Sequence, residues 1–147
     1  MVRLGVEQGR GDEALAIARG MAMTSYRSRE EFAERFSGGI DGAEPLTCSA
    51  PGAYLRARGE AYRAVMSPGR FLSLSASIDR HRCDPGAIAT PATLIGATTD
   101  LLVPPEQMRT LADRLAGPTT LHLSPSPWGH DMFLKEPAVL AAALGAI

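Results

Sequence analysis

Apolar residues recur at helical spacing through the first part of the chain. Between Gly11 and Thr24 they fall at i, i+3, i+4, i+7 and i+8, which places them on one face of a helix. Ser28 is an N-cap candidate for a second, short helix, because a serine hydroxyl accepts a hydrogen bond from an N–H of the first turn. The same spacing predicts a third helix over Tyr54–Met66, and Ser67-Pro68 predicts the start of a fourth that includes Phe71–Ile78.

Glycine and proline interrupt this helical pattern from Ser37 to Gly52, which predicts a loop. The pattern changes a second time near Asp84-Pro85, where short apolar runs replace the helical spacing. We therefore divide the chain into a helical region, residues 1–83, and a second region, residues 84–147, in which strands and helices alternate.

The second region has the order strand, loop, helix, strand, loop, helix. Thr93–Ala97 and Thr119–Leu123 predict buried strands, and the helix predicted between them ends at Gly117-Pro118. A final helix, Ala138–Ile147, is apolar on nearly all sides, so we expect it to be buried. This order is typical of a parallel α/β sheet. Because two strands alone do not form a stable parallel sheet, the region is predicted to be the end of a larger one.

The composition excludes several classes of function. Fifteen basic and sixteen acidic residues give a formal net charge of −1, so no nucleic-acid partner is expected. No apolar run reaches the ~18 residues that span a bilayer, and the first residues lack the apolar core of a secretory signal, so no membrane partner is expected. Cys48 and Cys83 have no metal-ligand spacing and form no disulfide framework. We expect a cytoplasmic protein without a metal.

An acid and a histidine follow the two predicted strands. Asp100 comes just after the first strand and His130 comes after the second. The carboxyl ends of the strands line the functional crevice of an open α/β sheet, and serine, acid, histidine is the order of an α/β-hydrolase triad. The histidine is the base of such a triad, and the carboxylate orients it. Alone, each residue is a weak signal; together they are predicted to form a hydrogen bond.

Three segments carry a family resemblance. Ala18–Ser28 reads ARGMAMTSYRS, Thr99–Gln107 reads TDLLVPPEQ, and Ser126–Leu134 reads SPWGHDMFL. They resemble, in this order, a helical segment, the acid loop and the histidine loop of the homoserine O-acyltransferases, which acylate homoserine in methionine biosynthesis. The likeness covers Gly11 to Leu144. It implies the C-terminal part of an α/β-hydrolase fold, with a helical lid followed by the last two strand–helix units of the parallel sheet.

The resemblance implies roles for five residues. Asp100 matches the triad acid of the family and His130 matches its base. Arg19 matches the arginine that holds the homoserine carboxylate, Tyr26 an active-site tyrosine, and Asp131 the acid that holds the substrate's amino group. A guanidinium suits a bidentate grip on a carboxylate. Without the resemblance, Arg19 would be interpreted as an exposed charge and Tyr26 as an amphipathic residue at a helix end.

The nucleophile of such an enzyme is absent from the sequence, which contains no Gly-x-Ser-x-Gly or close variant. We expect the serine to lie in an N-terminal half outside these residues, and the 147-residue chain alone to be inactive. With that half, the implied reaction moves an acetyl or succinyl group from acyl-CoA to the hydroxyl of L-homoserine through a serine acyl-enzyme. Acyl-CoA is a co-substrate, and no bound cofactor is implied. Both the donor and the acceptor, homoserine or serine, stay open.

Two alternatives also stay open. In the first, the chain is a non-catalytic remnant that acts at most as an association surface. In the second, it is part of a plain esterase of the same fold. In the first alternative the lid helices provide the association surface, because in family members they help to form a homodimer. Arg19 argues against the second, because an apolar ester offers a buried cation no partner. An upstream sequence that encodes a strand and a nucleophile elbow would decide between an enzyme and a remnant.

Overall fold

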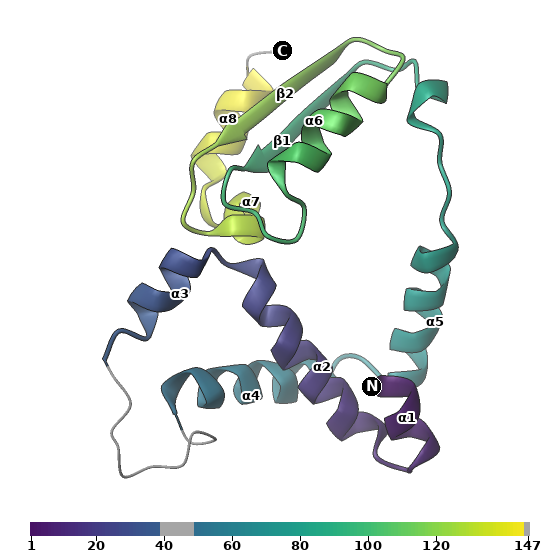
Figure 1. Cartoon of the computed structure of the whole chain (residues 1–147), viewed down its shortest axis with the longest axis vertical. Helices are drawn as coiled ribbons and strands as arrows, with labels where there is room; N and C mark the ends of the chain where they lie inside the picture. Colours follow the sequence, from purple (N-terminus) through teal and green to yellow (C-terminus); the bar gives the residue numbers. More distant parts are fainter. Residues whose placement is uncertain (39–48, 146–147) are drawn as a thin grey trace. The chain divides into compact units, whose positions relative to one another are not determined.

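The computed structural model describes residues 1–38 and 49–145 (Figure 1). The chain divides into two compact units, and neither is continuous in sequence. The first comprises Met1–Thr24 and Phe36–Arg82, and the second comprises Ser25–Arg35 and Cys83–Ile147. The short segment Ser25–Arg35 is therefore part of the unit that contains the sheet. The assignment of residues 1–83 to a lid and 84–147 to a core segment stays a prediction.

The first unit is helical. It contains α1 (Val2–Glu7), α2 (Gly11–Tyr26) up to Thr24, α4 (Ala50–Arg63) and α5 (Pro68–Arg80). The predicted helix from Gly11 is confirmed, and Leu15 on it is fully buried. The predicted cap of α5 is also confirmed, because the Ser67 hydroxyl accepts a hydrogen bond of 3.3 Å from the Arg70 N–H.

Two helices of this unit differ from the sequence prediction. α1 has no predicted counterpart, because six residues are too few to show a clear helical period; it packs against α5. α4 begins at Ala50 rather than Tyr54 and ends at Arg63 rather than Met66. Its N-cap is Ser49, so a proline is tolerated in its first turn, where no intrahelical partner for the N–H is lost. Residues 39–48 of the predicted loop, Cys48 included, lie outside the described residues.

Two glycines bring α2 and α4 close together. A Cβ on Gly59 of α4 would lie 2.2 Å from the carbonyl oxygen of Ala16, and a Cβ on Gly20 of α2 would lie 3.2 Å from the carbonyl oxygen of Leu55. The helices therefore meet through backbone at both points. Glycine at position 20 weakens an isolated helix, but here it lets α4 approach.

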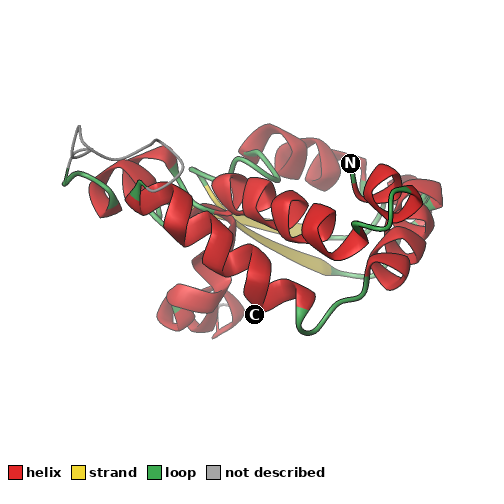
Figure 2. Ribbon diagram, turned by 90° about the horizontal axis from the view of Figure 1, so that it is seen from below, coloured by secondary structure: helices red, strands yellow, loops and turns green. Residues whose placement is uncertain are grey.

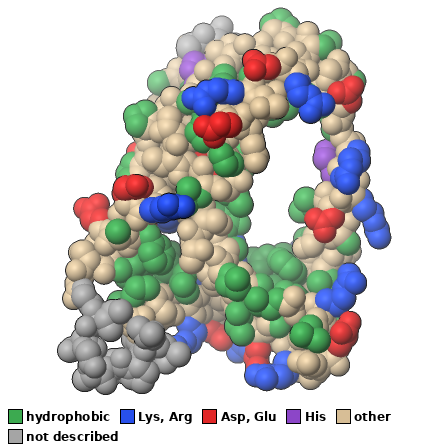
Figure 3. Space-filling view, in the orientation of Figure 1, with side chains coloured by type: hydrophobic (Ala, Val, Ile, Leu, Met, Phe, Trp, Pro, Cys, Tyr) green, Lys and Arg blue, Asp and Glu red, His purple; other side chains and the backbone are tan. Residues whose placement is uncertain are grey.

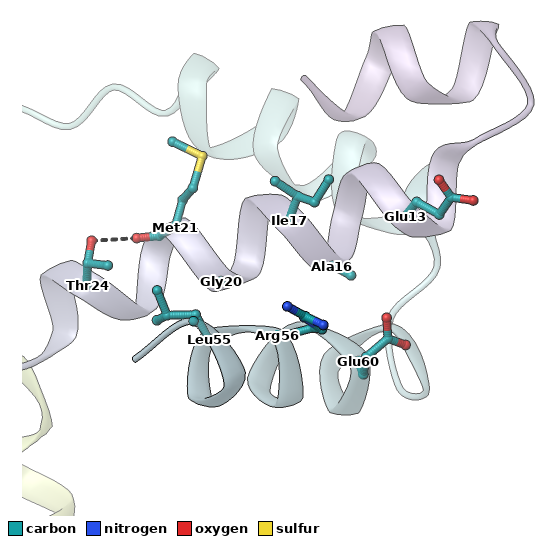
Figure 4. Close-up of a pocket in the computed structure, with 10 residues that line it drawn as sticks. Glu13, Ala16, Ile17, Gly20, Met21, Thr24, Leu55, Arg56 and Glu60 are labelled. Carbon is teal, nitrogen blue, oxygen red and sulfur yellow. Dashed lines mark hydrogen bonds between the residues drawn. The ribbon is translucent and has the colours of Figure 1, made fainter. Parts of the chain in front are cut away.

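An open groove of about 540 Å³ follows α2 and α4 (Figure 4). Ile17 and Met21, one turn apart on α2, line it and are each 59% exposed. Figure 3 shows apolar side chains gathered on the surface over α2. Charged residues of both helices also line the groove: Glu13, Arg56 and Glu60. The first unit thus presents an apolar surface with charges of both signs beside it.

The second unit contains a two-stranded sheet and its helices. Its elements are α3 (Arg29–Arg35), η2 (Pro85–Ala87), β1 (Ala92–Ala97), α6 (Pro105–Arg114), β2 (Thr119–Ser124), η3 (Gly129–Asp131), α7 (Met132–Lys135) and α8 (Pro137–Gly145). The strands run parallel and side by side (Figure 2), with Ala92 paired to Thr119 and Ala97 to Ser124. α6 packs on both strands. The predicted parallel arrangement, with a helix between the strands, is confirmed.

Burial in this unit is shallow. Among the strand residues only Ala97 is buried, and the others are half-buried or exposed. The expectation that the last helix is buried is wrong for this chain: in α8 only Ala143 is buried, and Leu144 is 56% exposed. α8 contacts β1 and α7, which cover one side of it. Apolar flanks of this kind fit the end of a larger sheet.

Candidate active site

Asp100 and His130 lie beside each other past the ends of β1 and β2. Nδ1 of His130 lies 2.8 Å from Oδ2 of Asp100, which confirms the predicted hydrogen bond. The other oxygen of Asp100, Oδ1, accepts the N–H groups of Leu102 at 2.8 Å and Val103 at 2.9 Å. Because Asp100 is only 8% exposed and accepts three hydrogen bonds, its carboxylate is held in one orientation. A neutral His130 that donates from Nδ1 keeps Nε2 as an acceptor.

The two loops that carry this pair are joined to each other. The Thr99 hydroxyl donates to the Ser126 carbonyl oxygen, and the Thr98 N–H donates to the carbonyl oxygen of Ser124 at 3.0 Å. Ser126 is 3% exposed, and its own hydroxyl accepts the Trp128 N–H at 3.1 Å, which closes a tight turn before His130. The parallel pairing of the strands thus continues into the loops and brings residues 100 and 130 together.

Aromatic rings surround the His130 imidazole. The centroid of the Tyr26 ring lies 5.7 Å from it, and Phe133 meets it edge-on at 6.2 Å. A small cavity of about 130 Å³ lies beside the pair and is lined by Met108, Met132 and Phe133 as well as by Asp100 and His130. The predicted active-site tyrosine is therefore next to the histidine.

Within residues 1–38 and 49–145, the structure shows neither a serine hydrogen-bonded to His130 nor a set of side chains that could hold a metal. In that part of the chain the hydrogen-bond partner of the His130 ring is Asp100, and no serine hydroxyl bonds to it. No group of three or more His, Cys, Asp or Glu side chains there is arranged to hold a metal ion. None of the helices described is long and apolar enough to cross a membrane.

Known proteins with similar sequences are named for the transfer of an acyl group to homoserine. The chain is 40% identical over 147 residues to a homoserine O-succinyltransferase of Xanthomonas campestris, a match that covers 97% of this chain and 40% of the relative. It is 34% identical over 143 residues to a homoserine O-acetyltransferase of Mycobacterium leprae (88% of this chain, 37% of the relative) and over 134 residues to one of Thermus thermophilus (84% and 33%). No protein-family model matches the chain.

Over most of its length, the chain is therefore similar in sequence to part of these homoserine O-acyltransferases. It spans between a third and two fifths of the length of the curated relatives that it matches. Among solved structures, a mutant esterase superposes with a TM-score of 0.78 over 91% of this chain and 41% of its own, at 17% sequence identity. That likeness shows the fold, which is the C-terminal part of an α/β-hydrolase.

The structure places the three residues matched to the acyltransferase substrate site in different surroundings. Tyr26 is beside His130. Asp131 directly follows His130, and its Oδ2 lies 2.9 Å from Nε of Arg27. Arg19 belongs to the first unit, where its guanidinium carbon lies 4.9 Å from the centroid of the Tyr62 ring. The roles of all three in binding homoserine stay predictions.

Arg27 is a buried residue beside the histidine loop that the sequence does not single out. It lies between Tyr26 and Ser28 in a segment that resembles the family, and the resemblance implies no role for its side chain. Its side chain is only 9% exposed, which is unusual for arginine and points to a specific partner. Sequence position alone carries no signal for such burial, because the partner Asp131 is more than a hundred residues away.

Proposed function

We propose that this chain provides the acid and the base of a homoserine O-acyltransferase. The observation that carries the proposal is the 2.8 Å pairing of His130 Nδ1 with Asp100 Oδ2 beyond the carboxyl ends of neighbouring parallel strands. Relatives named for succinyl and acetyl transfer to homoserine support the substrate class. The proposed donor is acetyl-CoA or succinyl-CoA, and the proposed acceptor is the hydroxyl of L-homoserine.

In the proposed reaction, a serine outside these 147 residues is the nucleophile. Nε2 of His130 takes the serine proton while the serine oxygen attacks the thioester carbonyl; the C–S bond breaks, and the CoA sulfur leaves with that proton. His130 then takes the proton of the homoserine hydroxyl, whose oxygen attacks the acyl-enzyme ester. The serine oxygen leaves and regains a proton from His130. Asp100 orients the imidazole and stabilises its charged form in both steps.

The proposed contacts to homoserine come from three residues. Arg19 binds the carboxylate, because a guanidinium offers two parallel N–H groups to it. Asp131 accepts hydrogen bonds from the ammonium group through Oδ1, since Oδ2 faces Arg27. Tyr26 borders the reacting centre from its place beside His130. A cytoplasmic location is part of the same proposal.

We test the activity with a chimera. The matching portion of the Xanthomonas relative is replaced by this chain, so that the relative supplies its own N-terminal residues. Release of CoA thiol and formation of O-acylhomoserine are measured with acetyl-CoA and with succinyl-CoA. The chimera is expected to turn over, and His130→Ala to abolish turnover. His81→Ala, which removes an exposed histidine of the first unit, is the matched control and is expected to retain activity.

The outcomes of this test separate the alternatives. A folded chimera that hydrolyses simple esters but does not acylate homoserine would favour an esterase. A folded chimera without either activity would favour a non-catalytic remnant. Turnover by the 147-residue chain alone, lost in His130→Ala, would show that a serine of this chain acts as nucleophile and would overturn the assignment of the serine to another segment.

A homodimer through the helices of the first unit is the proposed assembly. The apolar groove along α2 and α4 supports it, because Ile17 and Met21 lie exposed there (Figure 4). Met21→Glu is expected to convert a chimera dimer to a monomer in analytical ultracentrifugation. Leu111→Glu on α6, a half-exposed apolar residue of the other unit, is the control and is expected to leave the dimer intact. An unchanged Met21→Glu dimer would exclude this surface.

A further inference from the structure

We propose that Arg27 is a positioning residue that fixes residues Trp128–Asp131 of the histidine loop and thereby keeps His130 hydrogen-bonded to Asp100. The proposal rests on the proposed function for its kinetic consequence, while its structural part is independent of it. Arg27 itself does not contact the reacting atoms. It acts through Asp131 and Trp128, which flank the histidine on both sides.

The Arg27 side chain has two contacts with this loop. Nε lies 2.9 Å from Oδ2 of Asp131, and the guanidinium carbon lies 5.0 Å from the centroid of the Trp128 ring. One guanidinium thus pairs with a carboxylate and stacks on an aromatic face, a combination for which arginine is better suited than lysine. Because the two partners precede and follow His130, holding both restricts where its backbone lies.

The backbone before and after Arg27 is packed against the same loop. Gly129 has φ +54°, and a Cβ on it would lie 3.0 Å from both the Arg27 carbonyl carbon and the Ser28 nitrogen. Ser28 is 1% exposed, and its hydroxyl accepts the Glu31 N–H at 3.1 Å to cap α3. The backbone at Arg27 is therefore held in place by the cap of α3. If the histidine loop moved, the guanidinium could not move with it.

The charges around Arg27 form a small buried network. Its Nη1 lies 3.6 Å from Oε1 of Glu31, and that same oxygen accepts two N–H groups of Arg35 at 2.8 and 2.6 Å. Nε and Nη1 of Arg27 are buried without an aligned hydrogen bond in the described part of the chain. Arg27 and Asp131 thus attract each other as opposite charges at short distance, although the N–H is not aligned for a hydrogen bond.

This arrangement argues for positioning rather than for stability alone. Buried ion pairs often contribute little net stability, because desolvation offsets the attraction, but removing one partner leaves a buried charge unpaired. Without the guanidinium, the Asp131 carboxylate, 16% exposed, would have to turn toward water. Asp131 adjoins His130 in sequence, so we expect a shift of the loop that accompanies this turn to move the imidazole away from Asp100.

The structural test reads the His130 ring directly. The 147-residue chain has three histidines, His81, His122 and His130, so histidine-selective ¹⁵N labelling and one His130→Gln spectrum assign the signal. We expect wild type to show Nδ1 protonated and Nε2 bare. Arg27→Met is expected to lose this tautomer preference, and Arg27→Lys to restore it only in part.

Arg35→Met is the matched control. It removes an arginine of similar length from the same Glu31 carboxylate, and it is expected to leave the His130 signal unchanged. If Arg27→Met retains the wild-type tautomer, or if Arg35→Met alters it equally, the positioning role is wrong. Where Arg27→Met does not fold by circular dichroism, Asp131→Asn serves as the second variant and is expected to give the same loss of tautomer preference.

The kinetic test uses the chimera with the relative's N-terminal residues. Arg27→Met is expected to lower kcat on the order of 100-fold, as a displacement of about 1 Å does, with a smaller change in KM for acyl-CoA. Arg27→Lys is expected to recover part of kcat. A chimera that is inactive while the tautomer effect persists would refute the proposed function and keep the positioning role. Full activity of Arg27→Met would refute the positioning role alone.

Discussion

Replacing Gly129 by alanine is expected to destabilise the second unit and to displace the histidine loop. The backbone at Gly129 has φ +54°, in the left-handed region, where an added Cβ costs about 1–2 kcal/mol. The same Cβ would lie 3.0 Å from backbone atoms of Arg27 and Ser28, which are held in the cap of α3 and cannot yield easily. Overpacking of this kind costs about 1–3 kcal/mol. The expected total is about 2–5 kcal/mol.

Gly9 provides the matched control for this substitution. Its φ is +71°, also left-handed, but no atom lies within 4 Å of the position of a Cβ. Gly9→Ala is therefore expected to lose only the conformational part, about 1–2 kcal/mol. The difference between the two variants measures how firmly the loop at Gly129 is pressed against the chain at Arg27.

The assay is urea denaturation followed by far-ultraviolet circular dichroism, with Trp128 fluorescence as a local probe. Trp128 is the only tryptophan of the chain and lies in the histidine loop, so its emission reports the second unit. A domain is typically stable by only about 5–15 kcal/mol, so the expected loss is readily measured. Equal losses in Gly129→Ala and Gly9→Ala would refute the reasoning, since the backbone contact would then contribute nothing.

Three further predictions concern the helices, the acid and the surface. Gly59→Ala is expected to destabilise the first unit by about 1–3 kcal/mol in thermal denaturation, because its Cβ would lie 2.2 Å from a carbonyl oxygen. The control is Gly69→Ala on α5, where a Cβ meets open space, and it is expected to be neutral or stabilising. Asp100→Asn is expected to lower kcat of the chimera by on the order of 10⁴, whereas Asp84→Asn, at an exposed aspartate, is expected to leave it unchanged. The chain alone is expected to self-associate in light scattering, because half-buried strands and exposed apolar helices lack a cover; a monodisperse monomer with a cooperative melt would contradict this.

Local signals predicted most of the elements. The serines at positions 28 and 67 mark helix starts because a capping hydroxyl acts within three residues of itself, so no distant contact is needed. Chain order favours the pairing of Asp100 with His130, since parallel strands end at the same edge of a sheet, and the family resemblance assigns both residues to one triad. The sequence pattern does not predict the early start of α4, because glycine and proline near Ser49 are typical of loops as well as of a first helical turn.

Properties that depend on distant segments required the tertiary structure. The apolar pattern of α8 predicts burial, but burial depends on what covers the helix, and the segments described leave most of it exposed. Gly59 packs against Ala16, and Arg27 pairs with Asp131 of the histidine loop. Both contacts join residues far apart in sequence. A sequence pattern reports the chemistry and spacing of near neighbours; the partner of a buried charge is set only when the chain brings remote segments within a few ångströms.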